Sequence, residues 1–309
     1  MRTAFVLTGG GSLGAVQVGM MQALHERGIA ADLLVGTSVG AVNAAYLAGP
    51  GTTPDRLGSL AALWSRMRRK DVFAADPWRW WHASRGLSPS LFSAEPLRTL
   101  LQRCLGYQAF EDARLEVHVT ATDVVTGAAL ILGSGPVTPA VLASTAVPGL
   151  LPPVRHADST LVDGAVGHAS TLGFADSRGV ADIYLLPAGY PCAGPRPNSA
   201  LSVALTALSL VLHQQLIAEV RGYTGHARLH VVPPLCPMAV SSADFSQAAM
   251  LVRRGHDSTR DWLDRDVDGS AHDPAGTLSL HGRHHENRAE GRACPEAPAR
   301  RRPTQGAPA

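Results

Sequence analysis

Cysteine is scarce in this chain: four occur among 309 residues, at positions 104, 192, 236 and 294, and none forms a Cys-x-x-Cys pair. That scatter argues against a zinc site or a disulfide framework and favours a reduced, cytoplasmic setting. Charge is also sparse. A charged fraction of 17% and a formal net charge of +2 give no electrostatic basis for binding nucleic acid.

Long apolar runs are missing as well. The run at 201–212 is interrupted by hydroxyl side chains, and the stretch at 4–7 is too short for a signal peptide. Neither approaches the roughly 18 to 20 apolar residues that a spanning helix needs. We therefore expect a protein without a secretion signal, whose contact with a membrane, if it has one, is peripheral.

Hydrophobic residues are nevertheless plentiful, at 45% of the chain, and can fill a sizeable core. We predict one domain over residues 1–265 and a disordered, low-complexity tail over 266–309, where apolar residues other than alanine become rare. His281, His284 and His285 lie in that tail, and such charged surroundings favour a low-complexity segment over a metal site.

The first fifty residues alternate between strand and helix patterns. A buried strand at 4–7 precedes a helix at 15–27, and a second strand at 32–35 precedes a small-residue helix at 39–47. This order predicts a parallel α/β sheet. Further strands are expected at 115–122, 128–132, 160–162, 182–186 and 230–232, and further helices at 139–145, 201–219 and 245–263.

Residues 54–110 have helical tendency but are broken by Pro77, Pro89 and Pro96, and we predict a helical cap region there. This region holds Trp78, Trp80 and Trp81. Tryptophans in a cap are usually packed in the core. The alternative is docking on a membrane, with the nearby basic residues 66–70 facing anionic headgroups.

Two glycine-rich turns each follow a strand-like run: residues 9–14 read Gly-Gly-Gly-Ser-Leu-Gly, and residues 36–40 read Gly-Thr-Ser-Val-Gly. The second has the Gly-x-Ser-x-Gly form of a nucleophile elbow, in which Gly36 and Gly40 let a sharp turn expose the hydroxyl of Ser38. Because it lies between a strand and a helix, the pattern favours a catalytic serine, although Ser38 can also cap the helix.

Serine needs a base to accept its proton, and a tetrahedral intermediate needs donors for its oxyanion. The backbone N–H groups of Gly9, Gly10 and Gly11 can supply such donors at the start of a helix. Two residues stand out as the base. Asp163 follows a strand and precedes a glycine, a pattern that also occurs in plain turns, and His168 lies close behind it.

These blocks together resemble the bacterial patatin-like phospholipase family. Residues 9–19 resemble its oxyanion-hole block, 36–44 its nucleophile block and 163–165 its Asp-Gly-Gly or Asp-Gly-Ala block. Residues 121–127, 143–149 and 152–154 also resemble family segments, so that the likeness runs from about residue 3 to 186 and more loosely to 263.

The resemblance implies a three-layer α/β/α patatin-like fold with a mostly parallel central sheet, and hydrolysis of lipid acyl esters without metal or organic cofactor. It implies a catalytic dyad in which Ser38 attacks the acyl carbonyl and Asp163 accepts its proton, with Gly9, Gly10 and Gly11 as oxyanion donors. One position departs from the family: Leu13 stands where Arg or Lys is frequent, which puts a preference for anionic headgroups in doubt.

Three alternatives remain at this point. The glycines at 9, 11 and 14 with Asp32 fit a dinucleotide-binding fingerprint, except that Asp32 opens the second strand instead of closing it. An α/β-hydrolase with a Ser-Asp-His triad would have several strands before its nucleophile, whereas only one precedes Ser38. The third alternative is a catalytically silent lipid-binding or scaffolding protein, because a sequence does not prove turnover.

Overall fold

A single mixed sheet organises the molecule. The computed structural model describes residues 1–74, 76–189, 200–236, 238–265 and 274–278. Within them the sheet has eight strands: β1 (Thr3–Leu7), β2 (Leu33–Gly36), β3 (Glu116–Asp123), β4 (Ala129–Leu132), β5 (Val154–His156), β6 (Ser159–Asp163), β7 (Asp182–Leu186) and β8 (Arg228–Val231).

The strand order is β5-β6-β3-β2-β1-β7-β8, and β4 pairs with β3 outside this path. The run from β3 to β8 is parallel, whereas β4, β5 and β6 join antiparallel. The central strands are apolar and buried on both faces, as parallel strands covered by helices must be. β1 lies between β2 and β7, so that the first glycine turn emerges near the middle of the sheet.

The α-helices of the described residues connect these strands. They are α1 (Gly14–Glu26), α2 (Val39–Ala48), α3 (Thr53–Arg66), α4 (Pro77–Ser84), α5 (Glu95–Cys104), α6 (Val137–Ser144), α7 (Gly164–Gly167), α8 (Thr171–Ser177), α9 (Ala200–Gly222) and α10 (Ala248–Arg265). Short 3-10 helices lie at Gly11–Leu13 (η1), Arg69–Asp71 (η2), Phe110–Asp112 (η3) and Phe245–Gln247 (η4). None of the helices described is both long and apolar enough to span a bilayer.

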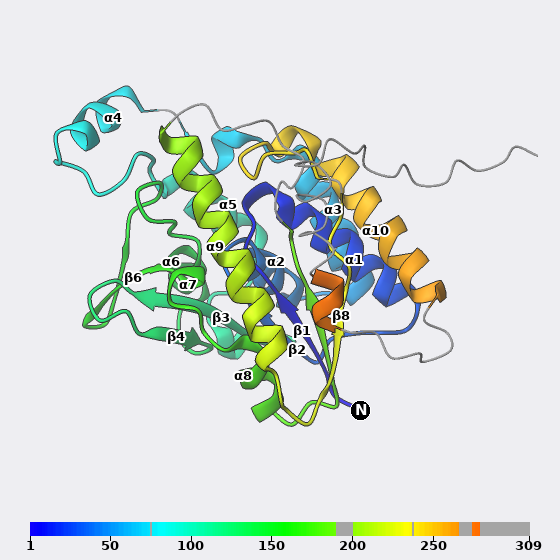
Figure 1. Cartoon of the computed structure of the whole chain (residues 1–309). Helices are drawn as coiled ribbons and strands as arrows, with labels where there is room; N and C mark the ends of the chain where they lie inside the picture. Colours follow the sequence, from blue (N-terminus) through cyan, green and yellow to red (C-terminus); the bar gives the residue numbers. More distant parts are fainter. Residues whose placement is uncertain (75, 190–199, 237, 266–273, 279–309) are drawn as a thin grey trace, which may run out of the picture.

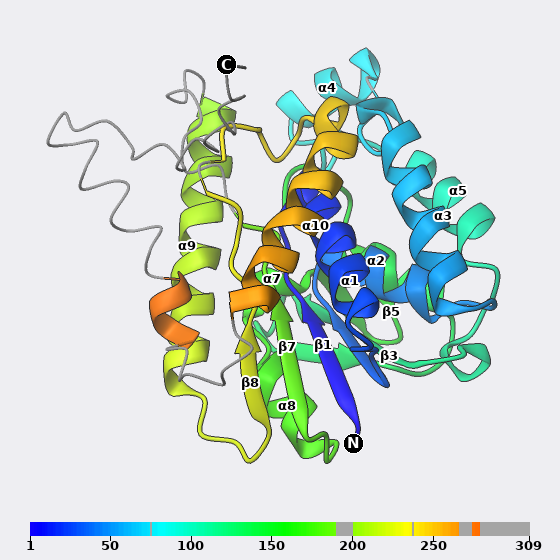
Figure 2. The same ribbon diagram turned by 90° about the vertical axis from the view of Figure 1, so that its right-hand side faces the viewer.

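Helices cover both faces of the sheet (Figures 1 and 2). One face carries α1, α2, α3 and α10 above the larger hydrophobic core, and the other carries α8 and α9 above a smaller one. The molecule is therefore a three-layer α/β/α structure with a mostly parallel central sheet, as the sequence predicts. Both views place the carboxyl end of β1 on the side where α4 lies, and the amino terminus at the opposite end.

The predicted elements of the opening segment agree with the structure to within one or two residues, and β7 agrees at both ends. The strand β5 and the short helices α7 and α8 are additions that the sequence did not indicate. Within 54–110 the chain forms α4 and α5 together with all but the first residue of α3.

Part of the predicted disordered tail is described. Residues 274–278 form a helical turn, and Leu278 is fully buried in the smaller core. The other residues of the predicted tail lie outside the described residues, so disorder of the tail stays a prediction. The histidines at 281, 284 and 285 lie outside the described residues.

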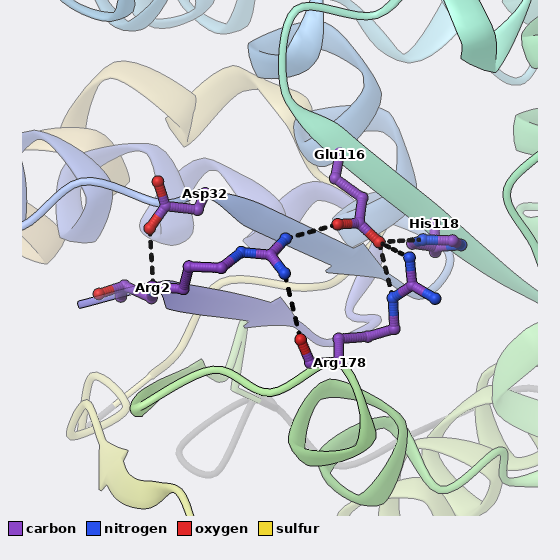
Figure 3. A network of polar contacts seen from close by, with 6 residues as sticks. Arg2, Asp32, Glu116, His118 and Arg178 are labelled. Atoms are coloured by element: carbon purple, nitrogen blue, oxygen red, sulfur yellow. Dashed lines mark hydrogen bonds and ion pairs between the residues drawn. The ribbon is translucent and has the colours of Figure 1, made fainter.

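A polar network holds the amino ends of the central strands together (Figure 3). Glu116 of β3 accepts hydrogen bonds from the guanidinium groups of Arg2 and Arg178 and pairs with His118, while the backbone N–H of Thr3 donates to Asp32. Burial raises the pKa of Glu116, but its hydrogen bonds outweigh this effect and lower the pKa to about 2. The network thus stabilises the sheet at the end remote from the two glycine turns.

Candidate active site

Ser38 occupies the turn between β2 and α2 in a strained backbone conformation. Its φ of 55° and ψ of −123° lie outside the regions that a residue with a side chain normally adopts. The flanking glycines make the turn possible, because a Cβ on Gly40 would fall on the carbonyl oxygen of Leu7 and one on Gly36 would lie 2.6 Å from the Cα of Ala41. This strand-turn-helix geometry is the one that a nucleophile elbow requires.

Asp163 reaches the same region from the antiparallel part of the sheet. It ends β6 and caps α7, where its Oδ1 accepts a hydrogen bond from the backbone N–H of Ala165 at 2.9 Å. Its carbonyl oxygen accepts one from the Thr122 hydroxyl at 2.9 Å. These contacts fix both the backbone and the carboxylate of Asp163.

The two side chains line one cavity. The exposed fraction is 8% for Ser38 and 3% for Asp163, so both side chains are buried. Burial raises the pKa of Asp163 to about 6, although the nearby Ser38 hydroxyl and the hydrogen bond from the Ala165 N–H lower it. A carboxylate with this pKa is ionised at neutral pH, and it is more basic than an exposed aspartate.

Gly9, Gly10 and Gly11 line the same cavity. A Cβ on Gly9 would lie 3.1 Å from the Cβ of Ser38, so the loop passes directly beside the serine. No group in the described part of the chain accepts a hydrogen bond from the backbone N–H of any of these three glycines. The loop continues into η1 and α1, whose amino ends add a positive electrostatic potential. The arrangement can accept an oxyanion.

The end of α6 contacts both Ser38 and Asp163, which the sequence did not predict. The buried Ser144 hydroxyl oxygen accepts a hydrogen bond from the backbone N–H of Ser38 at 3.0 Å. Two residues later, the carbonyl oxygen of Ala146 accepts one from the backbone N–H of Asp163 at 3.0 Å. One short segment therefore sets the position of the serine relative to the carboxylate.

A fully buried polar cluster supports the glycine loop from below. The Gln17 side-chain amide donates to the carbonyl oxygens of Thr8 and Leu186, at 2.8 and 3.0 Å. The Asn43 amide donates to Gln17 Oε1 at 2.9 Å, and Trp64 Nε1 donates to Asn43 Oδ1 at 2.9 Å. The start of the loop is thus tied to α2, the helix that follows Ser38.

His168, the second predicted candidate for the base, lies elsewhere. It lines a neighbouring cavity with His213, and among the described residues no histidine lines the cavity that holds Ser38. Of the two residues considered as the base, only Asp163 shares a cavity with Ser38.

Asp32 is also remote from the glycine loop. Its carboxylate accepts a hydrogen bond from the backbone N–H of Thr3 at 2.8 Å, at the amino end of β1, whereas the loop follows the carboxyl end of that strand. Asp32 cannot bind a ribose at the loop, which removes the structural basis for the dinucleotide alternative. In the portion described, no group of three or more His, Cys, Asp or Glu side chains could hold a metal ion.

Apolar side chains form much of the remaining cavity wall, and sequence patterns alone did not single them out. They are Leu13, Phe73, Val147, Pro148, Leu150, Val166, Leu208 and Leu212. They come from η1, from the segments after η2 and α6, from α7 and from α9. Such a wall suits an acyl chain better than a charged ligand.

Known proteins with similar sequences include lysophospholipases and uncharacterized proteins. Lysophospholipase nte1 of Aspergillus terreus is 30% identical over 179 residues, which are 58% of this chain and 11% of that protein. An uncharacterized NTE family protein of Mycobacterium tuberculosis is 30% identical over 161 residues, which are 52% of this chain and 26% of that protein. The matched region is thus a small part of these relatives.

Among solved structures, VipD from Legionella pneumophila aligns with a TM-score of 0.45 at 16% identity, covering 85% of this chain and 67% of that one. The family model described as patatin-like phospholipase matches residues 5–176, which include both glycine turns and Asp163. The match extends over more than half of the sequence, and the chain belongs to the patatin-like phospholipase family.

Proposed function

We propose that this protein hydrolyses acyl esters of lipids, as a phospholipase A or lysophospholipase, through an acyl-enzyme formed on Ser38. One observation carries the proposal: a strained serine, a buried carboxylate of raised pKa and the open amides of a glycine loop line the same cavity. Each of the three supplies a different requirement of acyl transfer.

In the first half-reaction the Ser38 oxygen attacks the acyl carbonyl carbon while Asp163 accepts the hydroxyl proton. The oxyanion forms beside the N–H groups of Gly9, Gly10 and Gly11, which stabilise it. When the tetrahedral intermediate collapses, the bond between the acyl carbon and the alcohol oxygen breaks. Asp163 returns its proton to the departing alcohol, and the acyl group remains on Ser38.

In the second half-reaction a water molecule attacks the acyl-enzyme while Asp163 accepts one of its protons. The bond between the acyl carbon and the Ser38 oxygen then breaks, and the proton passes to Ser38. The fatty acid is released, and the enzyme returns to its starting state. The proposal needs no histidine, because Ser38 and Asp163 line the same cavity and no histidine of the described residues lines it with them.

The composition of the cavity wall favours binding of a neutral or zwitterionic ester at the reacting centre over binding of an anionic group. Leu13 is buried in the cavity wall, and no Lys or Arg lines the cavity within the described residues. We therefore propose that acyl chains, and not headgroup charge, dominate recognition inside the cavity. The cytoplasmic setting, with peripheral contact at the inner membrane surface, is likewise part of the proposal.

The test is a screen of the purified full-length protein against phospholipids, lysophospholipids, triglycerides and short p-nitrophenyl esters, with Ser38→Ala as the control. We expect fatty acid release by the parent protein and none by the variant. Failure of a fluorophosphonate to label a folded parent protein, together with lipid binding without release, would identify a catalytically silent lipid-binding protein instead.

A further inference from the structure

The helix α4 presents its aromatic side chains to solvent. It has no buried residue, and the exposed fractions are 75% for Trp78, 43% for Trp80, 44% for Trp81 and 69% for Leu87 just beyond it. We call these four residues the aromatic face. Tryptophans normally lose most of their exposed surface on folding, so three exposed ones on a single short helix indicate an interaction surface.

Specific contacts hold α4 in place. The Asp76 carboxylate caps it by accepting hydrogen bonds from the backbone N–H groups of Trp78 and Arg79, both at 3.1 Å. The Arg79 guanidinium donates to the Ser90 hydroxyl at 3.1 Å. The tryptophans are therefore presented by a capped and anchored helix.

Positive charge surrounds the aromatic face. Residues 66–87 contain Arg66, Arg68, Arg69, Lys70, Arg79 and Arg85, against Asp71 and Asp76. Both aspartates accept backbone hydrogen bonds at helix starts, and the four basic residues at 66–70 are exposed. The Arg85 guanidinium lies 4.1 Å from the ring centroid of Trp81. This segment has a net charge of +4, whereas the whole chain has +2, so the excess is local.

The aromatic face is connected to the cavity of Ser38. The ring of Trp80 meets Phe92 edge to face at 6.3 Å, and Phe92 meets Phe73 at 5.3 Å between centroids. Phe73 lines the cavity, and so does Leu150, whose carbonyl oxygen accepts a hydrogen bond from the backbone N–H of Phe92. Any partner that binds the aromatic face would therefore lie near the cavity that holds Ser38.

The amino-terminal half of α9 lies at the same end of the molecule as α4 (Figures 1 and 2). It exposes Val203, Leu210 and Val211, with fractions of 51%, 42% and 53%, while Leu208 and Leu212 of the same helix line the cavity. Apolar side chains thus occur on two elements at this end.

We propose that the aromatic face, with the basic residues beside it, docks on the surface of an anionic lipid bilayer. Indole rings favour the boundary between headgroups and acyl chains, and clustered Arg and Lys side chains are attracted to anionic headgroups. The proposal extends the proposed function by naming the surface from which the acyl ester enters. Anionic charge is recognised at this docking face, and the apolar cavity then takes the acyl chain.

The test uses the full chain with Ser38→Ala, so that vesicles stay intact and binding is measured apart from hydrolysis. Flotation with phosphatidylcholine vesicles containing phosphatidylglycerol is compared with pure phosphatidylcholine vesicles, at low and high salt. We expect binding to the anionic vesicles that is at least tenfold stronger and that weakens with salt.

Two variants then locate the docking surface. Trp78→Ala with Trp81→Ala, and separately Arg69→Gln with Lys70→Gln, should each weaken binding at least tenfold, while Val125→Ala removes an exposed apolar side chain elsewhere and should not. The same substitutions in the catalytically competent chain should leave hydrolysis of a soluble p-nitrophenyl ester and the unfolding temperature unchanged.

Three results would overturn the proposal: no binding of the parent to anionic vesicles, binding by both double variants that equals that of the parent, or sedimentation showing that the tryptophans hold a dimer. Arg69 and Lys70 are exposed, so their double variant is expected to fold. It therefore still tests the proposal if the tryptophan double variant unfolds. Absence of ester hydrolysis would refute the proposed function and leave the binding result standing.

Discussion

Replacing Asp163 with asparagine should abolish activity and make the protein more stable. The folded protein at neutral pH holds the Asp163 carboxylate in a buried site, where its pKa is about 6 instead of the ordinary 3.8. A difference of about 2 pKa units, at about 1.4 kcal/mol each, corresponds to about 3 kcal/mol of unfavourable free energy in the folded state. Asparagine has nearly the same shape and no charge to bury.

The sign follows from proton binding. Between pH 4 and pH 6, roughly, the folded chain binds more protons at Asp163 than the unfolded chain does, because its pKa is the higher of the two. Stability therefore falls as pH rises through this window, and the full penalty is present above it. At pH 7 the free energy of unfolding of Asp163→Asn should exceed that of the parent by up to about 3 kcal/mol. This difference should shrink toward pH 4.

Asp182→Asn provides a matched control. Burial raises the pKa of Asp182, but hydrogen bonds from His230 and Arg228 outweigh it, so the pKa lies below its ordinary value. Replacing Asp182 with asparagine should therefore destabilise the protein. Denaturant unfolding of both variants and the parent at pH 5 and pH 7 gives the comparison. If Asp163→Asn loses as much stability relative to the parent as Asp182→Asn does, the reasoning is refuted.

Further predictions address other parts of the fold. The kcat/KM of the parent should rise with pH through about 6, since Asp163 must be ionised to act as the base; a profile flat from pH 5 to 8 would contradict this. Ser144→Ala should lower kcat by roughly ten- to a hundredfold with little change in KM, because it leaves the Ser38 N–H buried without an acceptor, and fluorophosphonate labelling should slow in parallel. Glu116→Gln should cost on the order of 1 kcal/mol in urea unfolding without changing kcat, because its network lies at the other end of the sheet. Gly40→Ala should strongly lower the unfolding temperature, whereas Gly58→Ala, at an exposed position of α3 with open space around it, should raise stability by up to about 1 kcal/mol.

Local sequence signals predict the centre of this fold well. Short apolar runs followed by glycine turns define β1 and β2, and small residues after Ser38 define α2, because strand and helix periodicity act over a few neighbouring residues. The same signals place Ser38 and the three glycines on turns that adjacent parallel strands bring together. The role of Asp163 came from the family resemblance, since Asp-Gly alone also describes an ordinary turn.

Contacts that depend on distant segments could not be predicted. Ser144 accepts its hydrogen bond from a residue 106 positions away, and nothing in its own neighbourhood distinguishes it from other helix-terminal serines. The tryptophans of α4 were expected to be packed in the core, and they are largely exposed, because exposure depends on which elements cover a helix and not on its composition. Short elements such as β5 and α7 depend on the same tertiary context.

The most direct test of the central claim is the site and stoichiometry of labelling by a fluorophosphonate, read by mass spectrometry of the intact protein and of its peptides. The account predicts one adduct per chain, located on Ser38, absent from Ser38→Ala and formed much more slowly in Asp163→Asn. An adduct on another residue, or lipid hydrolysis that persists in Ser38→Ala, would contradict it.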